Sequence, residues 1–215
     1  SALLVGYYRR LGNLVVESRR MREVASVIMR VAPTEEHVLV AGEAGAGTTL
    51  AIYTLHQFSD RSAQPLRTID CSIFDPKRDR GELEHILKEE EKGAVFFKQV
   101  NRLATDDQVA LGALLAPVKH RAGGGSIPRL LASATLVPNS GFPSLHPALH
   151  EVLCHTYIES PPLRERSADI LPLVYFFLCR DLDHGANLPD LDIDVSLVLE
   201  HYAWPGNVAE LEQML

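Results

Sequence analysis

The sequence predicts an α/β fold, in which a doubly wound parallel sheet is followed by a small C-terminal helical lid domain. Short apolar runs typical of buried strands alternate with helical patterns up to residue 160. One of these runs leads directly into a glycine-rich loop at residues 42–49. After Pro161 and Pro162 only helical patterns remain. We therefore predict an α/β domain over residues 1–160 and a helical lid domain over residues 161–215.

The first half of the chain contains three of the expected strands. Ser18 is a residue type that caps helix N-termini, and Met21, Val24 and Ile28 follow it at helical spacing. Pro33 ends this helix. The elements expected here are a helix at 18–32, a strand at 37–41, a helix at 48–58, a strand at 66–70, a helix at 81–91 and a strand at 93–97.

Glycine and proline punctuate the second half. Three consecutive glycines at 123–125 predict a mobile turn within 121–126, and residues 137–147 are rich in Pro, Gly and Ser and predict a loop. The elements expected here are a helix at 106–118, strands at 129–133 and within 151–158, and helices at 167–182, at 195–202 and from residue 207. The last helix still continues at Leu215, so we expect a fragment of a longer protein.

Composition and charge exclude several classes of protein. A formal net charge of −7 argues against broad nucleic-acid binding by this segment. Cys71, Cys154 and Cys179 are far apart and have neither metal-ligand nor disulfide spacing, so we expect no metal site and a reducing, cytoplasmic setting. No apolar run reaches the length of a membrane span, so no membrane partner is expected.

Residues 42–49 nearly match the P-loop pattern G-x-x-x-x-G-K-[ST], in which backbone N–H groups at a helix N-terminus cradle phosphate. Gly42, Gly47 and Thr49 match, but Thr48 stands where a lysine would reach the β- and γ-phosphates. On its own, the loop is also compatible with a tight turn after a strand. The residues of the predicted vestigial nucleotide site are Gly42, Glu43, Ala44, Gly45, Ala46, Gly47, Thr48 and Thr49.

Two C-terminal motifs favour the nucleotide-site interpretation. Residues 160–170 read Ser-Pro-Pro-Leu-Arg-Glu-Arg-Ser-Ala-Asp-Ile, and residues 204–212 read Trp-Pro-Gly-Asn-Val-Ala-Glu-Leu-Glu. With the P-loop they resemble, over residues 14–215, the NtrC-like bacterial enhancer-binding proteins, which are AAA+ ATPases that remodel RNA polymerase carrying the sigma-54 factor. The resemblance implies a P-loop AAA+ fold, in which Arg164 and Arg166 fix the lid against the core and face the nucleotide pocket.

The resemblance also marks positions where catalytic residues are replaced. The family's Asp-Glu pair, which holds Mg²⁺ and polarises the attacking water, corresponds to Lys98 and Gln99. Lys98 would compete with Mg²⁺, but it could pair with phosphate and partly replace the missing lysine. The two arginine-finger positions correspond to His146 and Val152, and the sensor arginine of the last helix corresponds to Ala209. The family's Gly-Ala-Phe-Thr-Gly-Ala loop, which touches sigma-54, does not occur in the sequence.

These replacements predict a catalytically dead AAA+ domain, a pseudo-ATPase. We expect it to be the central domain of a bacterial transcriptional regulator, acting in oligomerisation, regulation or ligand sensing without sigma-54 remodelling. ATP or ADP would bind, if at all, without hydrolysis. Expected partners are RNA polymerase or other transcription machinery, DNA through a domain outside this segment, and a further copy of the chain in weak self-association.

Two alternatives stay open at this point. A cyclic di-GMP or nucleotide-sensing module would use the arginines at positions 9, 10, 19, 20 and 22 to meet phosphates bidentately, whereas the simpler interpretation is that they are solvated on a helix face. A residual ATPase that activates sigma-54 polymerase is the other alternative.

Overall fold

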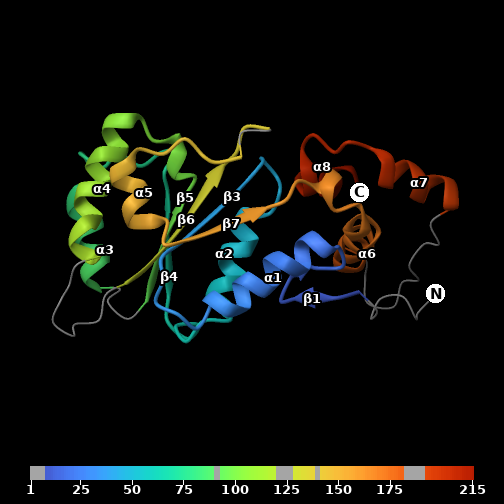
Figure 1. Cartoon of the computed structure of the whole chain (residues 1–215), viewed down its shortest axis with the longest axis horizontal. Helices are drawn as coiled ribbons and strands as arrows, with labels where there is room; N and C mark the ends of the chain where they lie inside the picture. Colours follow the sequence, from blue (N-terminus) through green and yellow to red (C-terminus); the bar gives the residue numbers. More distant parts are fainter. Residues whose placement is uncertain (1–7, 90–92, 120–127, 139–140, 182–191) are drawn as a thin grey trace.

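The computed structural model describes residues 8–89, 93–119, 128–138, 141–181 and 192–215 (Figure 1). Its centre is a five-stranded parallel sheet in the order β4-β5-β6-β3-β7. The strands are β3 (Val38–Gly42), β4 (Leu66–Asp70), β5 (Ala94–Lys98), β6 (Arg129–Thr135) and β7 (Thr156–Ser160). This sheet confirms the predicted α/β fold class. The glycine turn predicted within 121–126 lies outside the described residues.

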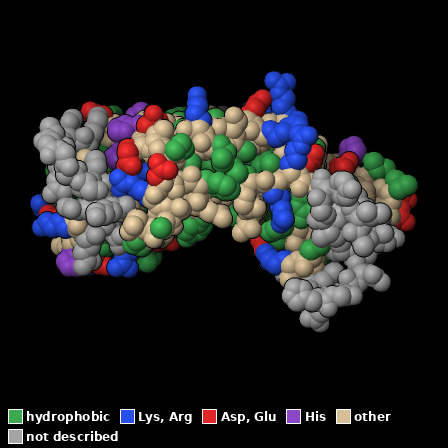
Figure 2. Space-filling model, turned by 90° about the horizontal axis from the view of Figure 1, so that it is seen from below, with side chains coloured by type: hydrophobic (Ala, Val, Ile, Leu, Met, Phe, Trp, Pro, Cys, Tyr) green, Lys and Arg blue, Asp and Glu red, His purple; other side chains and the backbone are tan. Residues whose placement is uncertain are grey.

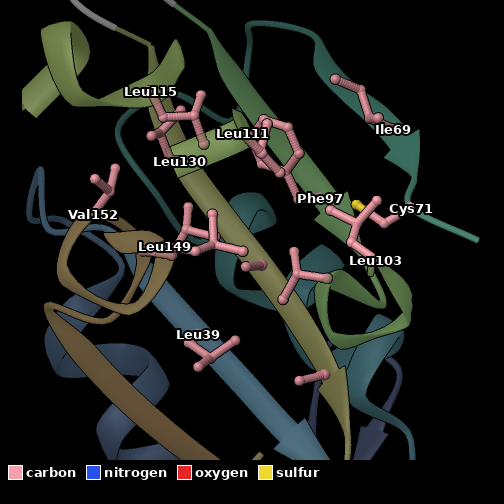
Figure 3. Packing of buried hydrophobic residues seen from close by; sticks show 14 of the residues in the cluster. Leu39, Ile69, Cys71, Phe97, Leu103, Leu111, Leu115, Leu130, Leu149 and Val152 are labelled. Carbon is pink, nitrogen blue, oxygen red and sulfur yellow. The ribbon is translucent and has the colours of Figure 1, made fainter. Parts of the chain in front are cut away.

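Helices cover both faces of the sheet. They are α1 (Arg19–Val31), α2 (Thr48–Gln57), α3 (Arg80–Glu89), α4 (Thr105–Lys119) and α5 (Pro147–Leu153). Strand β3 shows why two layers form, because its side chains alternate between the faces. Val38 and Val40 pack in one cluster with α1 and α2, whereas Leu39 and Ala41 pack in another with α3, α4 and α5 (Figure 3).

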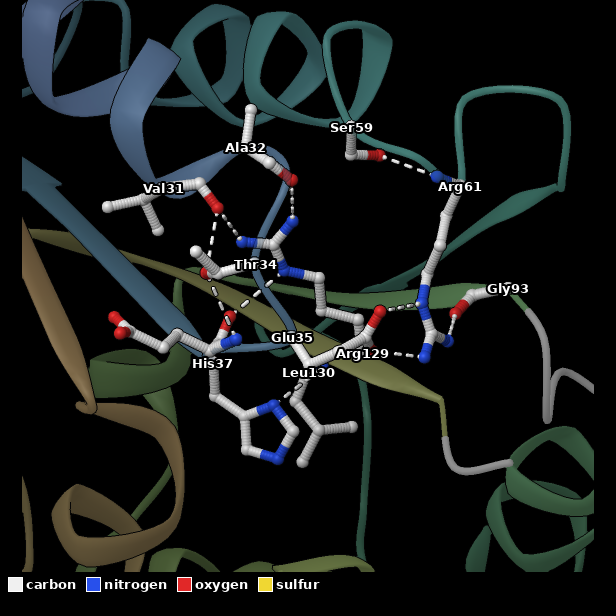
Figure 4. A network of polar contacts seen from close by, with 11 residues as sticks. Val31, Ala32, Thr34, Glu35, His37, Ser59, Arg61, Gly93, Arg129 and Leu130 are labelled. Carbon is white, nitrogen blue, oxygen red and sulfur yellow. Dashed lines mark hydrogen bonds and ion pairs between the residues drawn. The ribbon is translucent and has the colours of Figure 1, made fainter. Parts of the chain in front are cut away.

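A buried arginine fixes the end of α1. Arg129, at the start of β6, donates to the carbonyls of Ala32 at 2.7 Å, Val31 at 2.9 Å and Glu36 at 2.9 Å (Figure 4). Burial lowers the pKa of this guanidinium to about 10, so it remains charged at neutral pH. A cation at the C-terminus of a helix satisfies unpaired carbonyls and favours the helix dipole. Arg129 therefore ties the sheet to α1 by a structural contact.

The C-terminal segment forms a helical lid at one end of the sheet (Figure 1). It contains α6 (Ile170–Asp181), α7 (Ile193–His201) and α8 (Asn207–Met214), preceded by two short 3₁₀ helices, η2 (Leu163–Glu165) and η3 (Ser167–Asp169). Its core is centred on Val174, Trp204 and Leu211. Fully buried Asp169 accepts from the Ser18 amide at 2.7 Å and hydroxyl at 2.6 Å, which joins the lid to the start of α1. A boundary between residues 160 and 161 remains a prediction.

Two elements differ from the sequence predictions. An antiparallel hairpin of β1 (Arg10–Leu11) and β2 (Leu14–Val15) precedes α1 and was not predicted. Helix α5 occupies residues assigned to the end of a loop and the start of a strand, and β7 begins only at Thr156. Pro147 at the first turn favours this helix, and its apolar side chains at helical spacing face the core. In the described part of the chain, none of the helices has the length and apolarity needed to cross a membrane.

Candidate nucleotide site at the P-loop and lid

The glycine-rich loop connects β3 to α2 in the manner of a phosphate-binding loop. Gly45 and Gly47 have φ angles of +76° and +96°, a conformation that glycine adopts without strain. Gly45 also lies close to the lid, because a Cβ built there would be 2.2 Å from the carbonyl oxygen of Gly206. Helix α2 begins at Thr48, so its unpaired N–H groups face the loop. The sequence therefore forms a P-loop that packs directly against the lid.

Backbone and amide hydrogen bonds join the lid to this loop. The amide of Val208 donates to the carbonyl of Gly45 at 3.1 Å. Asn207, fully buried at the start of α8, donates from Nδ2 to the carbonyl of Ala44 at 2.9 Å and accepts from the amide of Leu163 at 2.7 Å. Its φ of +55° is one that asparagine tolerates better than most residues. Asn207 thus connects three segments that are far apart in the sequence.

A bidentate ion pair reinforces the same junction. Arg164 donates from Nη1 and Nη2 to the carboxylate of Glu43, at 2.7 and 2.6 Å. The hydrogen bond from Arg164 is the main cause that holds the pKa of Glu43 below its ordinary value, and a bond from Asn207 acts in the same direction. Charge-assisted fork contacts of this kind fix geometry as well as adding energy. Arg164 therefore lies between the P-loop and the lid.

Arg166 lies on the inner side of this junction. It is only 4% exposed, and its Nη2 donates to the carbonyl of Ala46 at 2.7 Å. Ser160 donates to the same carbonyl at 2.9 Å. Burial lowers the pKa of Arg166 to about 10, and its Nε has no hydrogen-bond partner among the described residues. A charged group with one unsatisfied buried nitrogen is thus placed beside the P-loop.

A cavity of about 630 Å³ opens between the P-loop and the lid. The hairpin, α2, the ends of β5 and β6, α6 and α8 all contribute to its walls. This volume lies in the range of small-molecule and cofactor sites. Sequence reasoning missed the contributions of the hairpin and α6, because no motif marks them and only the fold brings them to the loop. They are Asn13, Leu14, Val15, Leu173, Phe176, Phe177 and Arg180.

The residues at the expected acidic positions lie at the end of β5. The ammonium of Lys98 is 3.2 Å from the carboxylate of Asp70, and Lys98 is not among the residues that line the cavity. This contact does not favour the hypothesis that Lys98 replaces the P-loop lysine. Gln99 does line the cavity, and its backbone is left-handed. Its backbone N–H donates to the hydroxyl of Ser133 at 3.1 Å. The pKa of Asp70 is lowered, first by Ser72 and then by Lys98.

The arginine-finger and sensor positions hold side chains with other roles. His146 caps α5, accepting on Nδ1 from the amide of Ala148 at 3.3 Å. Val152 is 4% exposed and packs in the core on the inner face of α5 (Figure 3). Ala209 lines the cavity, with its Cβ 3.1 Å from the position that a Cβ on Gly45 would take. These positions therefore supply no guanidinium to the cavity.

The arginine-rich segment lies on the outer surface. Figure 2 shows basic side chains on the face that carries α1 and the hairpin, near the lid. Arg19 pairs with Glu23 and Arg20 with Glu165, each at 3.0 Å, and both arginines are exposed. None of the five arginines lines the P-loop cavity. The described structure thus favours their interpretation as solvated side chains.

The remaining site-like features are structural. Cys71 is 2% exposed, and burial raises the pKa of its thiol to about 12, so it packs as an inert group. No cluster of three or more His, Cys, Asp and Glu side chains suited to a metal ion occurs among the described residues. A second hollow, of about 510 Å³, lies between the edge strand β4 and α3, away from the P-loop.

The fold and the site together define a P-loop protein of the AAA+ class with a helical lid. A family model described as the sigma-54 interaction domain matches residues 14–83, and one described as the AAA+ ATPase lid domain matches residues 164–215. The chain is an AAA+ domain related to those of the NtrC-type, sigma-54-dependent transcriptional regulators.

Individual relatives agree with this assignment. The nitrogen fixation protein AnfA of Azotobacter vinelandii is 27% identical over 94% of this chain and 42% of its own length. The transcriptional regulatory protein ZraR of Klebsiella oxytoca is 30% identical over 93% of this chain and 50% of its own. NtrX of Brucella abortus, solved in complex with ATP, superposes with a TM-score of 0.77 at 25% identity, covering 95% of this chain and 52% of that one. The chain thus spans about half the length of the curated relatives it matches.

Proposed function

We propose that this domain is a non-hydrolysing AAA+ module of a bacterial transcriptional regulator. It acts by holding a nucleotide, by regulating or by associating with further copies, and not by remodelling sigma-54 polymerase. The observation that carries the proposal is the end of β5, where the ammonium of Lys98 is paired with Asp70. In the AAA+ relatives that the sequence resembles, this position would hold Mg²⁺ through a carboxylate.

Three further positions support the proposal. Thr48 begins α2 without the positive charge that a P-loop lysine brings to the β- and γ-phosphates. Gln99 lines the cavity, but an amide cannot act as a base toward water. Val152 is buried, so the side chain at this arginine-finger position does not reach a neighbouring subunit. An arginine finger alone is worth about 10³ to 10⁵ in rate.

The residues present do not fit a catalytic Mg²⁺ site. Thr49 retains the hydroxyl that a P-loop offers to the metal, but the carboxylate partner is replaced by the Lys98 ammonium. A like charge at this place raises the free energy of a bound divalent cation.

The partners that we propose follow from the family resemblance. They are the transcription machinery, and DNA through a domain outside these 215 residues.

Phosphate release from Mg·ATP by the purified chain tests the proposal. The expected result is a rate equal to that of the Thr49→Ala variant, which removes the hydroxyl at the P-loop position that meets the metal. The region of ZraR that this chain matches, assayed in parallel, serves as the reference. Mg²⁺-dependent turnover that disappears in Thr49→Ala would show that the domain is an ATPase and overturn the proposal.

A further inference from the structure

The charges that line the P-loop cavity are nearly all matched. Its described charged residues are Glu43, Arg166, Arg180 and Glu212. Glu43 is paired with Arg164, and Arg180 is paired with Glu212, each at 2.6 Å. Arg166 differs, because its guanidinium donates to the neutral carbonyl of Ala46, whereas the Asp169 carboxylate acts on it through charge and not through a hydrogen bond between described residues. One guanidinium that is hydrogen-bonded to no carboxylate thus remains to meet a ligand in this part of the structure.

Arg166 is also built into the site more firmly than a surface arginine. It is 4% exposed, and its Nε is buried without a partner among the described residues. A buried donor left unpaired costs free energy, which a ligand oxygen would recover. The pKa of about 10 keeps the group charged at neutral pH. A phosphate oxygen is the acceptor that a guanidinium and the N-terminus of α2 would bind together.

The amount of phosphate charge that this cavity can neutralise is limited. The P-loop lysine is replaced by Thr48, and the Mg²⁺ ligand is replaced by Lys98, whose ammonium points to Asp70 and is absent from the cavity lining. A terminal phosphate monoester carries a charge of about −1.5 to −2 at neutral pH, and every further phosphate adds more. With one guanidinium that is hydrogen-bonded to no carboxylate, and with Lys98 in place of a Mg²⁺ ligand, each added phosphate increases the uncompensated charge in a partly enclosed site.

We propose that the cavity binds a nucleoside monophosphate without Mg²⁺ and that Arg166 is the cation that holds its phosphate. The inference rests on the proposed function, since it assumes that the AAA+ pocket still takes a nucleotide. A Mg·ATP site prefers ATP to AMP, and we expect this cavity to prefer AMP. The backbone N–H groups of the loop and the start of α2 complete the anion site around the phosphate.

Titration calorimetry of the purified chain with AMP and with ATP, each with and without Mg²⁺, tests the inference. We expect AMP to bind about tenfold or more tightly than ATP, and Mg²⁺ to change either affinity by less than about twofold. The Arg166→Gln variant should lose about tenfold or more in AMP affinity. Arg19→Gln, on the exposed face of α1, removes a guanidinium outside the cavity and should leave AMP binding unchanged.

A second variant keeps the test decisive if Arg166→Gln does not fold. Thr48→Lys restores the missing P-loop charge at the partly exposed start of α2, and it should shift the preference toward ATP by about tenfold. Tighter binding of ATP than of AMP by the unmodified chain, or no AMP binding, would overturn the inference while leaving the absence of hydrolysis intact. ATP turnover would overturn the proposed function instead, so the two failures are distinguishable.

Discussion

The junction between the P-loop and the lid contrasts with the end of β5 and with α5, where the resemblance implies catalytic groups. At the junction, Glu43, Asn207 and Arg166 each meet a partner across the two segments. At β5 and α5, Lys98 and Val152 hold positions where the resemblance implies an acid and a cation. Binding architecture and catalytic groups therefore depend on different residues.

A physical reason explains why residues at the junction are more constrained than residues at the end of β5. Asn207 and Arg166 at the junction are buried and hydrogen-bonded, so replacing them leaves unsatisfied polar atoms and lowers the free energy of unfolding. The side chains of Lys98 and Asp70 are only partly buried, and a solvent-accessible pair contributes little to stability. Replacing catalytic groups of this kind costs activity, whereas replacing junction groups costs the fold. Substitutions in α5 and at the junction test this difference.

Val152→Arg is expected to have the largest effect. It places a guanidinium at a 4% exposed position in the core between α5 and the sheet (Figure 3). We expect it to lower the free energy of unfolding by more than about 4 kcal/mol, or to prevent folding, because the buried charge has no partner. Urea denaturation followed by circular dichroism measures this.

Val109→Arg is the matched control for that substitution. Val109 lies on α4 and is 40% exposed, so the same change should shift stability by less than about 0.5 kcal/mol. A Val152→Arg variant as stable as the Val109→Arg variant would mean that position 152 is accessible to a neighbouring subunit. Position 152 would then remain available to an arginine finger, and α5 would not differ from the junction in the way described.

Asn207→Ala tests the junction between the P-loop and the lid. The change leaves the buried amide of Leu163 without its acceptor and removes the donor to the more accessible carbonyl of Ala44. We expect a loss of about 2–4 kcal/mol in the free energy of unfolding. Arg19→Ala, which breaks only an exposed ion pair, should cost less than about 0.5 kcal/mol. Equal urea midpoints for the two variants would contradict a stabilising role for the junction.

Sequence patterns predicted the fold well because most of its elements carry strong local signals. Apolar runs gave all five strands of the sheet, and β4 begins and ends at the predicted residues. The hairpin and α5 escaped prediction, since β1 and β2 have two residues each and α5 has seven, too short for a periodic pattern to stand out. Their conformation depends on tertiary contacts with the lid and with α4.

The candidate site was predictable only in part, for a related reason. Motif residues such as Arg164 could be placed from the sequence, because the family resemblance of the Pro-Pro-Leu-Arg-Glu-Arg segment implies a position facing the nucleotide pocket. The pairing of Lys98 with Asp70 could not, because it depends on β4 and β5 being neighbours in the sheet. The orphan nitrogen of Arg166 is also a property of packing, which no local pattern encodes.

The Glu43–Arg164 pair should give the smallest effect, and its pH dependence separates it from other causes. The hydrogen bond from Arg164 lowers the pKa of Glu43 in the folded state, so the stabilisation is complete above the unfolded pKa of about 4.3 and is lost as the pH falls through the lower folded value. We expect Glu43→Gln to be less stable than the wild type by about 1 kcal/mol at pH 7. Urea midpoints measured from pH 7 down to about pH 3 should show the two proteins converging on the acid side.

Glu84→Gln, in an exposed pair with Arg80 on α3, is the matched control and should show a smaller difference that salt removes. A Glu43→Gln difference that stays constant down to the lowest pH would mean that the carboxylate charge is not what holds the P-loop to the lid.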